Sequence, residues 1–329
     1  MERGVSLPPA PAPRTAEWHR SVVLLGAQRF GPTLNACIRE LGLEGRAALV
    51  TAGWQDRELE DERLRAHIDC EAVNLRLYQR AEQVYVEDPE LARAHREKQT
   101  KLRHKQDFYR VRLEHELDAN HVIRQRQAPV DVLEEEEQAS VAAIRALDAY
   151  HLSQCQRVHA EFEAALLPPE REAVARQREE LRAELEDCAL VCVAGGHVAS
   201  LLNRMRLFGF KDLIGNKPVL AWSGGAMVCT ERVVLFHDSP PQGPGASEVL
   251  DEGLGLVDNV VVLPHPETRL RLYDEERVSL FARRFDPALC LAMHEGSHVT
   301  FEGRRARRPH QVSQLSADGR CVTFSRGTA

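Results

Sequence analysis

The sequence predicts an α/β protein with a mostly parallel sheet, interrupted by a large all-helical insertion. Residues 22–51 have the pattern of a strand, a helix and a second strand, a unit that requires a right-handed crossover between parallel strands. The chain has 20 glycines, yet none lies between Trp54 and Ala194. Because the turns of a sheet need glycine and long helices avoid it, this middle region must have a different structure. Glycine therefore divides the chain into two sheet-forming parts and one helical part.

The first part of the α/β domain spans residues 21–79. An arm of residues 1–20 precedes it, rich in proline and without the apolar stretch of a signal peptide, so we expect a flexible N-terminal arm. The elements expected after the arm are a strand at 22–26, a helix at 31–41, a strand at 47–51 and a short strand near 72–75.

The helical insertion spans residues 80–187 and is rich in Glu, Arg, Gln, Ala and Leu, which are strong helix formers. From Val132 onward, apolar residues recur at steps of three and four, which predicts an amphipathic helix. Prolines at positions 129, 168 and 169 divide the region into at least three long helices. Three roles stay open for this insertion: a lid, a dimerisation arm or a docking element for a partner.

The second part of the α/β domain spans residues 188–329. Strands are expected at 189–194, 219–222, 233–236 and 260–263, with a helix at 199–207. Near the end of the chain, residues 290–293, 298–301, 311–315 and 321–324 read as four short strands, some of them antiparallel at one margin of the sheet.

The most informative motif is V-L-A-W-S-G-G-A-M-V at residues 219–228. The apolar run stops at Ser223, and the small residues Gly224, Gly225 and Ala226 follow it. This composition is typical of a nucleophile elbow, in which a strained serine stands directly above the start of a helix. The N–H of Gly224 is then placed to stabilise an oxyanion. Glycine-rich turns without a catalytic serine are also common in α/β proteins, so the motif alone leaves both interpretations open.

A serine nucleophile needs a base, and the base needs an acid that orients it. Asp238 follows the apolar run 233–236, and His265 follows the apolar run 260–263. We expect Ser223, Asp238 and His265 to close three strands at one edge of the parallel sheet, where ligands bind in open α/β sheets. The alternative interpretation is that the aspartate and the histidine are ordinary loop residues.

The motifs V-A-G-G-H-V-A-S-L-L, A-W-S-G-G-A, H-D-S-P, L-P-H and M-H-E-G-S resemble those of the dipeptidase E and cyanophycinase family of serine peptidases. The resemblance covers residues 189–329 well, residues 21–53 weakly and most of the middle not at all. It implies a class I glutamine amidotransferase-like fold, which is a flavodoxin-like three-layer sandwich. It also implies that Ser223 is the nucleophile, His265 the general base and Asp238 the acid that orients this base.

The same resemblance implies further site residues. Gly195 and Gly196 fall on the glycine loop that gives the second oxyanion donor, and Glu295 falls on an acidic position near the site. The chain departs from the family where His197 and Val198 replace an Asn-Thr pair, which puts His197 in the presumed substrate cleft and leaves the specificity open. Gly224 also stands where alanine is usual, a change that leaves an elbow functional.

The best-known family members favour peptides with an aspartyl residue at the scissile bond. Arg269 and Arg277 are the matching cationic candidates here, because a guanidinium group suits a carboxylate. The alternative interpretation is that both arginines are solvated residues on a helix surface.

Composition fits a cytoplasmic enzyme. A formal net charge of −7 and a pI near 6.1 argue against nucleic acid or a membrane surface as the partner. Eight cysteines without C-x-x-C pairs suit reduced thiols. His151, Cys155 and His159 lie on one helix face, but a fourth ligand is not evident, so we expect no metal site, and the chemistry needs no cofactor.

These observations predict a serine hydrolase that cleaves a peptide or isopeptide bond, with a homodimer formed through the helical insertion. A glutamine amidotransferase requires cysteine at the elbow, and an α/β-hydrolase needs more room than the 42 residues between Ser223 and His265. The alternative function is a non-catalytic amidotransferase-like scaffold whose insertion binds a protein partner.

Overall fold

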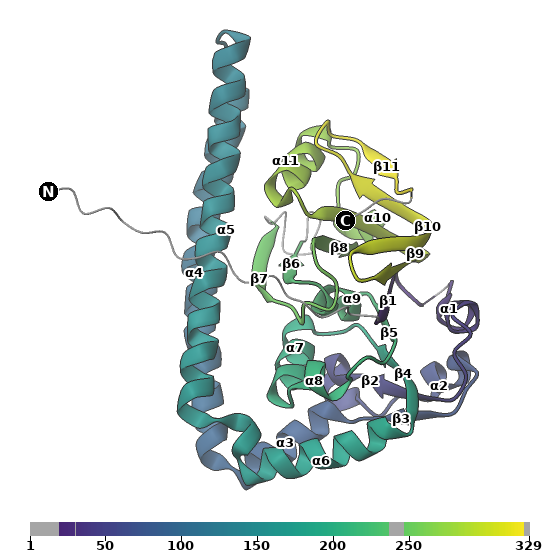
Figure 1. The fold of residues 1–329 in the computed structure, drawn as a ribbon. Coiled ribbons are helices and arrows are strands. Elements are labelled where there is room, and N and C mark those ends of the chain that lie inside the picture. The colour runs from purple at the N-terminus through teal and green to yellow at the C-terminus, as the bar shows by residue number, and fades with distance from the viewer. Residues whose placement is uncertain (1–19, 30, 237–246, 326–329) are drawn as a thin grey trace, which may run out of the picture.

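Five neighbouring parallel strands form one side of the sheet, out to its edge, in a computed structural model that describes residues 20–29, 31–236 and 247–325 (Figure 1). The strand order is β11-β10-β9-β1-β5-β4-β2-β3, with β8 paired to β9. The strands are β1 (Ser21–Leu25), β2 (Arg46–Val50), β3 (Ala72–Asn74), β4 (Cys188–Val193), β5 (Val219–Trp222), β8 (Val260–Pro264), β9 (Leu289–Glu302), β10 (Arg305–Leu315) and β11 (Cys321–Thr323). The prediction of an α/β fold with a mostly parallel sheet and a large helical segment is confirmed. The expected arm 1–20 lies outside the described residues, apart from Arg20.

The antiparallel margin is built differently from the expectation. Residues 290–293 and 298–301 belong to one long strand, β9, so the expectation of two short strands is wrong. A change of partner along β9 explains the difference. Its first half pairs in parallel with β8, from Leu289 to Met293, whereas its second half pairs antiparallel with β1, from His298 to Glu302.

The run 233–236 does not join the main sheet. β6 (Arg232–Leu235) pairs antiparallel with β7 (Glu248–Glu252) in a separate two-stranded sheet. Both sides of β5 are occupied, by β1 and β4, and the connection from β5 to β6 is shorter than the dozen or so residues that a parallel crossover takes. The expectation that Asp238 follows a strand of the parallel sheet is therefore wrong, and Asp238 itself lies outside the described residues.

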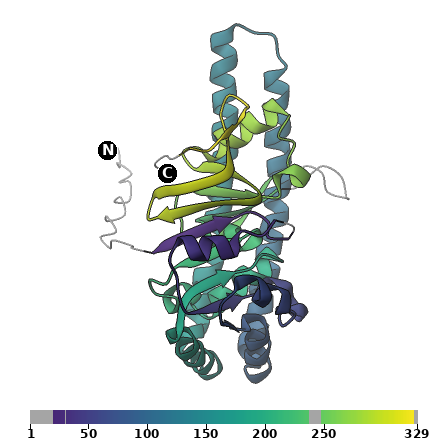
Figure 2. The ribbon, with the colours of Figure 1, turned by 90° about the vertical axis from the view of Figure 1, so that its right-hand side faces the viewer.

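Helices cover both faces of the sheet (Figures 1 and 2). One face packs into a small apolar cluster that includes Leu34, Ile38 and Ile68, and the other face packs into a larger cluster with Leu201, Met205 and Val228. The helices outside the long hairpin are α1 (Leu34–Glu40), α2 (Glu62–Ile68), α3 (Leu77–Glu87), α6 (Glu172–Glu186), α7 (Val198–Leu207), α8 (Phe210–Leu213), α9 (Gly224–Cys229), α10 (Pro266–Arg269) and α11 (Glu275–Phe285), with short 3-10 helices at Ala52–Arg57 and Pro168–Glu170. Among the described helices, none combines the length and the apolar character needed to span a membrane.

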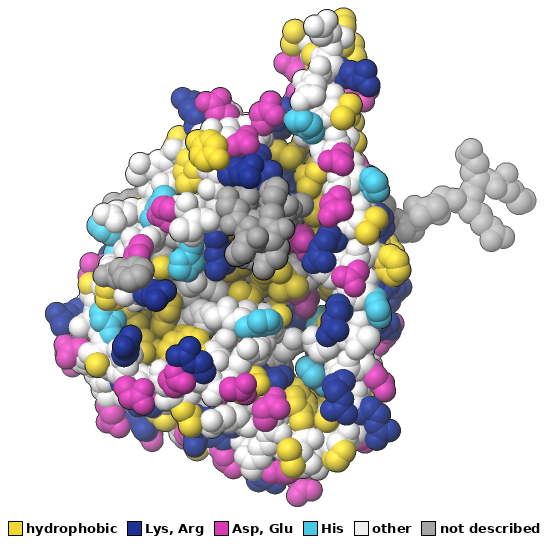
Figure 3. Space-filling model, turned by 180° about the vertical axis from the view of Figure 1, so that it is seen from behind, with side chains coloured by type: hydrophobic (Ala, Val, Ile, Leu, Met, Phe, Trp, Pro, Cys, Tyr) yellow, Lys and Arg dark blue, Asp and Glu magenta, His cyan; other side chains and the backbone are white. Residues whose placement is uncertain are grey.

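Two long antiparallel helices, α4 (Pro89–Arg124) and α5 (Val130–Leu166), form a hairpin along one side of the α/β body. Its far end extends beyond the body (Figures 1 and 2). Side chains of both charges are interspersed along its surface, as Figure 3 shows. The hairpin contacts the body through β7 and α11 rather than through the parallel sheet.

A buried polar network fastens the hairpin to the body. Arg284 of α11 donates two hydrogen bonds to Asp148 of α5, each of 2.7 Å, and a third of 2.9 Å to the Tyr109 hydroxyl of α4. The Tyr109 hydroxyl in turn donates to Asp148 and accepts from the backbone N–H of Val249 in β7. Arg284 and Asp148 are 4% and 3% exposed, so this ion pair is desolvated and fully hydrogen-bonded. Four elements that are distant in the chain are thereby held in one arrangement.

Candidate functional site

Ser223 stands in the sharp turn between β5 and α9. Its backbone has φ 52° and ψ −125°, a strained conformation for a residue that is not glycine. Its N–H donates a 3.3 Å hydrogen bond to the carbonyl of Leu25 at the end of β1. A Cβ at Gly225 would lie 2.2 Å from the carbonyl oxygen of Val193, so only glycine fits two residues after the serine. The small residues after Ser223 are thus required by how closely α9 approaches β4.

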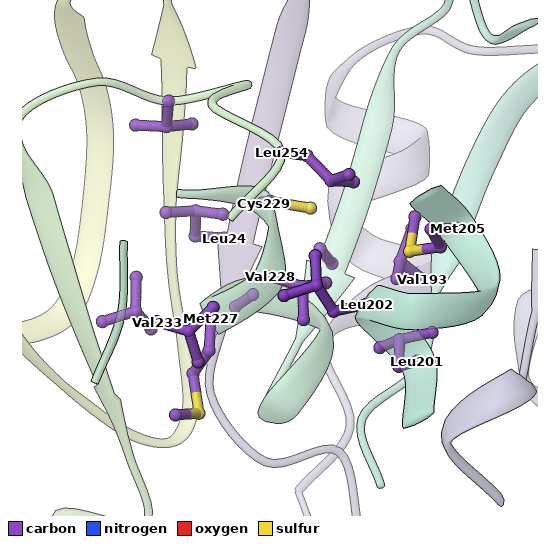
Figure 4. Packing of buried hydrophobic residues seen from close by; sticks show 14 of the residues in the cluster. Leu24, Val193, Leu201, Leu202, Met205, Met227, Val228, Cys229, Val233 and Leu254 are labelled. Carbon is purple, nitrogen blue, oxygen red and sulfur yellow. The ribbon is translucent and has the colours of Figure 1, made fainter. Parts of the chain in front are cut away.

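The first helix after the serine is held in the core. Met227, Val228 and Cys229 of α9 are at most 3% exposed. Figure 4 shows them among Leu24 of β1, Val193 of β4 and the α7 residues Leu201, Leu202 and Met205. Although α9 has only six residues, this packing fixes the direction in which the turn presents Ser223.

The glycine loop after β4 lies directly against the serine. A Cβ at Gly195 would lie 2.9 Å from the backbone nitrogen of Gly224 and 3.1 Å from Ser223 Oγ. Gly196, at φ 124°, approaches Gly53 so closely that a Cβ there would lie 2.4 Å from the Gly53 carbonyl oxygen. Gly53 also accepts a 2.7 Å hydrogen bond from the N–H of His197. Three loops therefore meet beside Ser223 through backbone contacts that leave no space for side chains.

His265 reaches the serine from a different direction. It follows β8 in a left-handed conformation, φ 58° and ψ 46°, and precedes α10. Its Nε2 lies 2.9 Å from Ser223 Oγ, which is hydrogen-bond distance. The structure therefore brings these two predicted residues together.

The change of partner along β9 explains how they meet. β8 runs parallel to β9 and ends opposite Met293, whereas β1 runs antiparallel to β9 and ends opposite His298. The carboxyl ends of β8 and β1 consequently approach each other along β9, separated by residues 294–297. Since β5 is in register beside β1, Ser223 and His265 face each other across this gap. The expectation that both residues close strands of one parallel edge is therefore wrong in its geometry, although the two residues do meet.

The environment of His265 favours the neutral form of its imidazole by lowering its pKa. Burial lowers the pKa of His265, and the positive charge of Arg269 lowers the pKa further, whereas Glu267 and Glu295 act in the opposite direction. A neutral imidazole is the form that accepts a proton. The pair can therefore carry out nucleophilic chemistry, with the serine attacking and the histidine receiving its proton.

The two carboxylates that act on His265 in the described part of the chain already have partners. Glu267 Oε1 lies 2.5 Å from His294 Nδ1, and Glu295 Oε1 accepts a 2.7 Å hydrogen bond from the N–H of Gly31. Glu295 thus lies near the site, on the segment of β9 between the ends of β8 and β1.

The other predicted site residues lie at three different helices, α7, α10 and α11. His197 caps α7, where its Nδ1 accepts a 3.1 Å hydrogen bond from the N–H of Ser200. Arg269 is half-buried at the end of α10, and burial lowers its pKa. Arg277 lies in the first turn of α11, at a cavity of about 540 Å³ that α11 forms with the far part of α4.

Sequence reasoning missed two contributions to this region. Gly53 supports the glycine loop, and the only signal was one glycine three residues after the end of β2. The pair of Glu267 and His294 lies beside His265, but its members are 27 residues apart on different elements, so no local spacing pointed to it.

Among the described residues, no group of three or more His, Cys, Asp or Glu side chains is placed to hold a metal ion. His159, one of the three helix-face residues, instead lies 2.8 Å from Asp251.

Comparison with known proteins identifies the family. Two solved structures match the chain: a peptidase from an acI-B1 Actinobacterium, with 12% identity and a TM-score of 0.46 over 94% of this chain and 99% of that one, and a putative peptidase E protein from Listeria monocytogenes EGD-e, with 9% identity and a TM-score of 0.43 over 90% and 99%. No curated protein matches the chain. The profile of Peptidase family S51 matches residues 142–308, which is half of the chain and confirms the resemblance seen in the sequence. The chain therefore belongs to Peptidase family S51 and is a serine-type peptidase.

Proposed function

We propose that Ser223, His265 and Asp238 form the catalytic triad of a peptidase that cleaves a peptide or isopeptide bond. The observation that carries this proposal is the 2.9 Å contact between Ser223 Oγ and His265 Nε2, made by a serine in the strained conformation of an elbow. The strained backbone at Ser223 is costly, persists only where the surrounding structure imposes it, and is of the kind that clusters at functional sites.

The proposed reaction has two stages. Ser223 Oγ attacks the scissile carbonyl carbon while His265 Nε2 takes the hydroxyl proton, and the same proton then goes to the leaving amine as the C–N bond breaks. Water hydrolyses the acyl-enzyme by the same route. His265 must carry its own proton on Nδ1 throughout, and we assign the acceptor of that hydrogen bond to Asp238 on the family resemblance. Glu267 and Glu295 are the competing carboxylates, but both are engaged elsewhere.

The backbone N–H of Gly224 and the Gly195–Gly196 loop are the proposed oxyanion hole. This proposal is supported by the close approach of Gly195 to both Gly224 N and Ser223 Oγ.

Hydrolysis of a mixed panel of peptides and isopeptides, followed by mass spectrometry, tests the proposed function. The native enzyme should generate products that Ser223→Ala does not, and equal products from both proteins would refute it.

Gly195→Ala should lower kcat/KM by about 100-fold or more, the usual cost of losing an oxyanion donor. The added methyl group would lie 2.9 Å from Gly224 N and 3.1 Å from Ser223 Oγ, so the turn must shift. Gly42→Ala is a control for an added methyl group away from the site: a Cβ there meets open space, and the strain at its left-handed backbone, φ 62°, acts on stability rather than on the turn at Ser223. Steady-state kinetics on one cleaved peptide decide: equal activity of the two variants would exclude the loop from the oxyanion hole.

Arg269 is the proposed partner of a substrate carboxylate next to the scissile bond. It is half-buried, its charge acts on His265, and among the described residues its guanidinium group makes no hydrogen bond or ion pair, although its backbone N–H donates to the carbonyl of His265. A half-buried cation whose side chain has no partner suits an acidic substrate residue. Arg277, Glu295 and His197 are further proposed contacts, with Arg277 placed farther along the chain at the α11 cavity.

The acid limb of the pH profile of kcat/KM should shift in opposite directions when a positive or a negative charge near His265 is removed. The base acts in its neutral form, and Arg269 lowers the pKa of His265, so Arg269→Gln should move the acid limb to higher pH. Glu267 raises that pKa, and Glu267→Gln should therefore move the acid limb to lower pH. Profiles of kcat/KM between about pH 4 and 9 measure both shifts. Shifts in the same direction would show that His265 is not the titrating base.

We also propose a homodimer through the helical hairpin, in a reducing compartment such as the cytoplasm. All eight cysteines are free thiols, which supports the compartment. Phe108 and Val111 of α4 and Tyr150 of α5 are large apolar side chains with 69%, 54% and 48% exposure, which supports a partner on the hairpin.

Light scattering at micromolar concentration should give the mass of a dimer for the native chain. Phe108→Glu combined with Val111→Glu should give a monomer, because a symmetric interface would bury each charge twice. Peptidase activity of the variant provides the control for folding. A native chain that is already monomeric refutes the dimer, and the lid interpretation of the hairpin would then be preferred.

A further inference from the structure

A second cavity, of about 550 Å³, lies between the hairpin and α7. Its residues on the α/β side include His197, which caps α7, and Ala199 and Asn203 in the first two turns of α7. Its volume is within the range of 300–1,000 Å³ that is typical of ligand sites.

The cavity begins close to the nucleophile. His197 is two residues from Gly195, and a Cβ at Gly195 would lie 3.1 Å from Ser223 Oγ. Two Cα–Cα steps span at most about 7.6 Å, and an extended peptide advances about 3.4 Å per residue. These lengths place His197, at the edge of the cavity, within about three residues of extended peptide from Ser223 Oγ.

The opposite wall is one face of α4. Its lining residues are at positions 99, 102, 103, 106, 107 and 110, the three- and four-residue spacing of a single helical face over three turns. This wall is fixed in place. Gln99 and Asn203 exchange two side-chain hydrogen bonds of 3.0 and 3.2 Å across the cavity, and Arg110 donates a 2.7 Å hydrogen bond to Glu248 of β7.

The charges of the lining are balanced with one exception. Asp107 lies 3.6 Å from Arg110, and Asp251 pairs with Arg206 and His159. Arg103 is exposed, and in the part of the chain that the structure describes its guanidinium group has neither a hydrogen bond nor an ion pair. The unmatched charge on the wall is therefore a cation, suited to a carboxylate.

We propose that this cavity extends the substrate cleft, that α4 is its specificity wall, and that Arg103 binds a carboxylate of a peptide longer than a dipeptide. The inference rests on the proposed role of Ser223. It gives the hairpin a function within the site: the hairpin selects substrates by length and by a carboxylate about two to four residues from the scissile bond. This carboxylate comes either from a chain terminus or from an acidic side chain.

Binding to the Ser223→Ala variant tests the inference without hydrolysis. One peptide ladder is Asp-Ala(n), with n from 1 to 5 and the carboxyl end free or amidated. A second ladder is Ala(n)-Asp-Ala, with the amino end succinylated or acetylated. Affinity measured by calorimetry should rise with peptide length in at least one ladder. Within that ladder, the peptide with the distal carboxylate should bind more tightly than the peptide of the same length whose end is amidated or acetylated. A third set of peptides places glutamate at each position in turn. It shows whether the bound carboxylate belongs to an acidic side chain or to the end of the peptide.

Arg103→Gln should weaken binding of the long carboxylate peptides about ten-fold and change dipeptide binding less than two-fold. Arg93→Gln is the matched control, since Arg93 is an exposed arginine of α4 outside the cavity. Ala199→Phe should fill the cavity from the α7 side and remove the gain with length for charged and neutral peptides alike.

Affinities that do not change with length, or identical effects of Arg103→Gln and Arg93→Gln, would overturn the inference. Failure of the proposed function has a different signature, because Ser223→Ala would then hydrolyse peptides as the native enzyme does. The ladder would still report on the cavity in that case.

Discussion

Ser223→Ala and His265→Ala should each lower kcat/KM for a cleaved peptide by about 10⁴-fold or more. The reason is the 2.9 Å contact between Ser223 Oγ and His265 Nε2, which makes the two side chains one chemical unit. The double variant should therefore be little worse than either single variant, because removing one member already removes the function of the other. Full activity in Ser223→Ala would end the assignment of the nucleophile.

The acid is identified by comparing three carboxylates in the same assay. Asp238→Asn should lower kcat by about 10⁴-fold, through loss of control over the imidazole tautomer. Glu267→Gln and Glu295→Gln should act mainly through the pKa of His265, with much smaller losses at its optimum pH. A large loss in Glu295→Gln instead of Asp238→Asn would transfer the role of the acid to Glu295.

Arg284→Met should lower the free energy of unfolding by about 3–5 kcal/mol, the largest stability effect that we expect from a single substitution. The change leaves the carboxylate of Asp148 buried without its cation, in a network that joins α4, α5, α11 and β7. Arg284→Met combined with Asp148→Leu should recover much of the loss, because no unpaired charge remains in the core.

Arg283→Met is the matched control in urea unfolding. The neighbouring Arg283 pairs with Glu137 at 3.1 Å, and both side chains are about one quarter exposed, so its loss should cost no more than about 1 kcal/mol. Equal effects at positions 283 and 284 would show that the buried network does not hold the hairpin to the body.

The sharp turn at Ser223 could be predicted because its constraints are local. A serine between an apolar strand and a short helix requires small neighbours, and the two glycines after Ser223 are adjacent to it in the sequence. The region of long helices was equally visible, because the absence of glycine and the enrichment of helix formers extend over about a hundred residues.

The arrangement of the later strands could not be predicted, because it depends on distant pairing. Residues 295–297, Glu-Gly-Ser, have the composition of a turn, yet β9 continues through them and changes its partner from β8 to β1. The run 233–236 has the composition of a core strand, yet both sides of β5 are occupied and the connection from β5 is too short for a parallel crossover, so this run pairs with β7 outside the main sheet.

The contacts that attach the hairpin to the α/β body could not be predicted for a different reason. Tyr109, Asp148 and Arg284 are polar, and a sequence pattern assigns such residues to the solvent. Asp148 and Arg284 are 136 residues apart, so nothing local indicates that they pair in the core. The amphipathic pattern therefore identified the helices but not what they pack against.

The most direct test of the central claim is labelling with a fluorophosphonate, which reacts with an activated serine hydroxyl. Mass spectrometry of the digested protein should place the adduct on Ser223, and Ser223→Ala should remain unlabelled, while Ser200→Ala, which changes a nearby serine of α7, should be labelled like the native chain. His265→Ala should label far more slowly, because the base that activates the hydroxyl is gone. Absence of an adduct on the native protein, or an adduct on any other serine, would contradict the account.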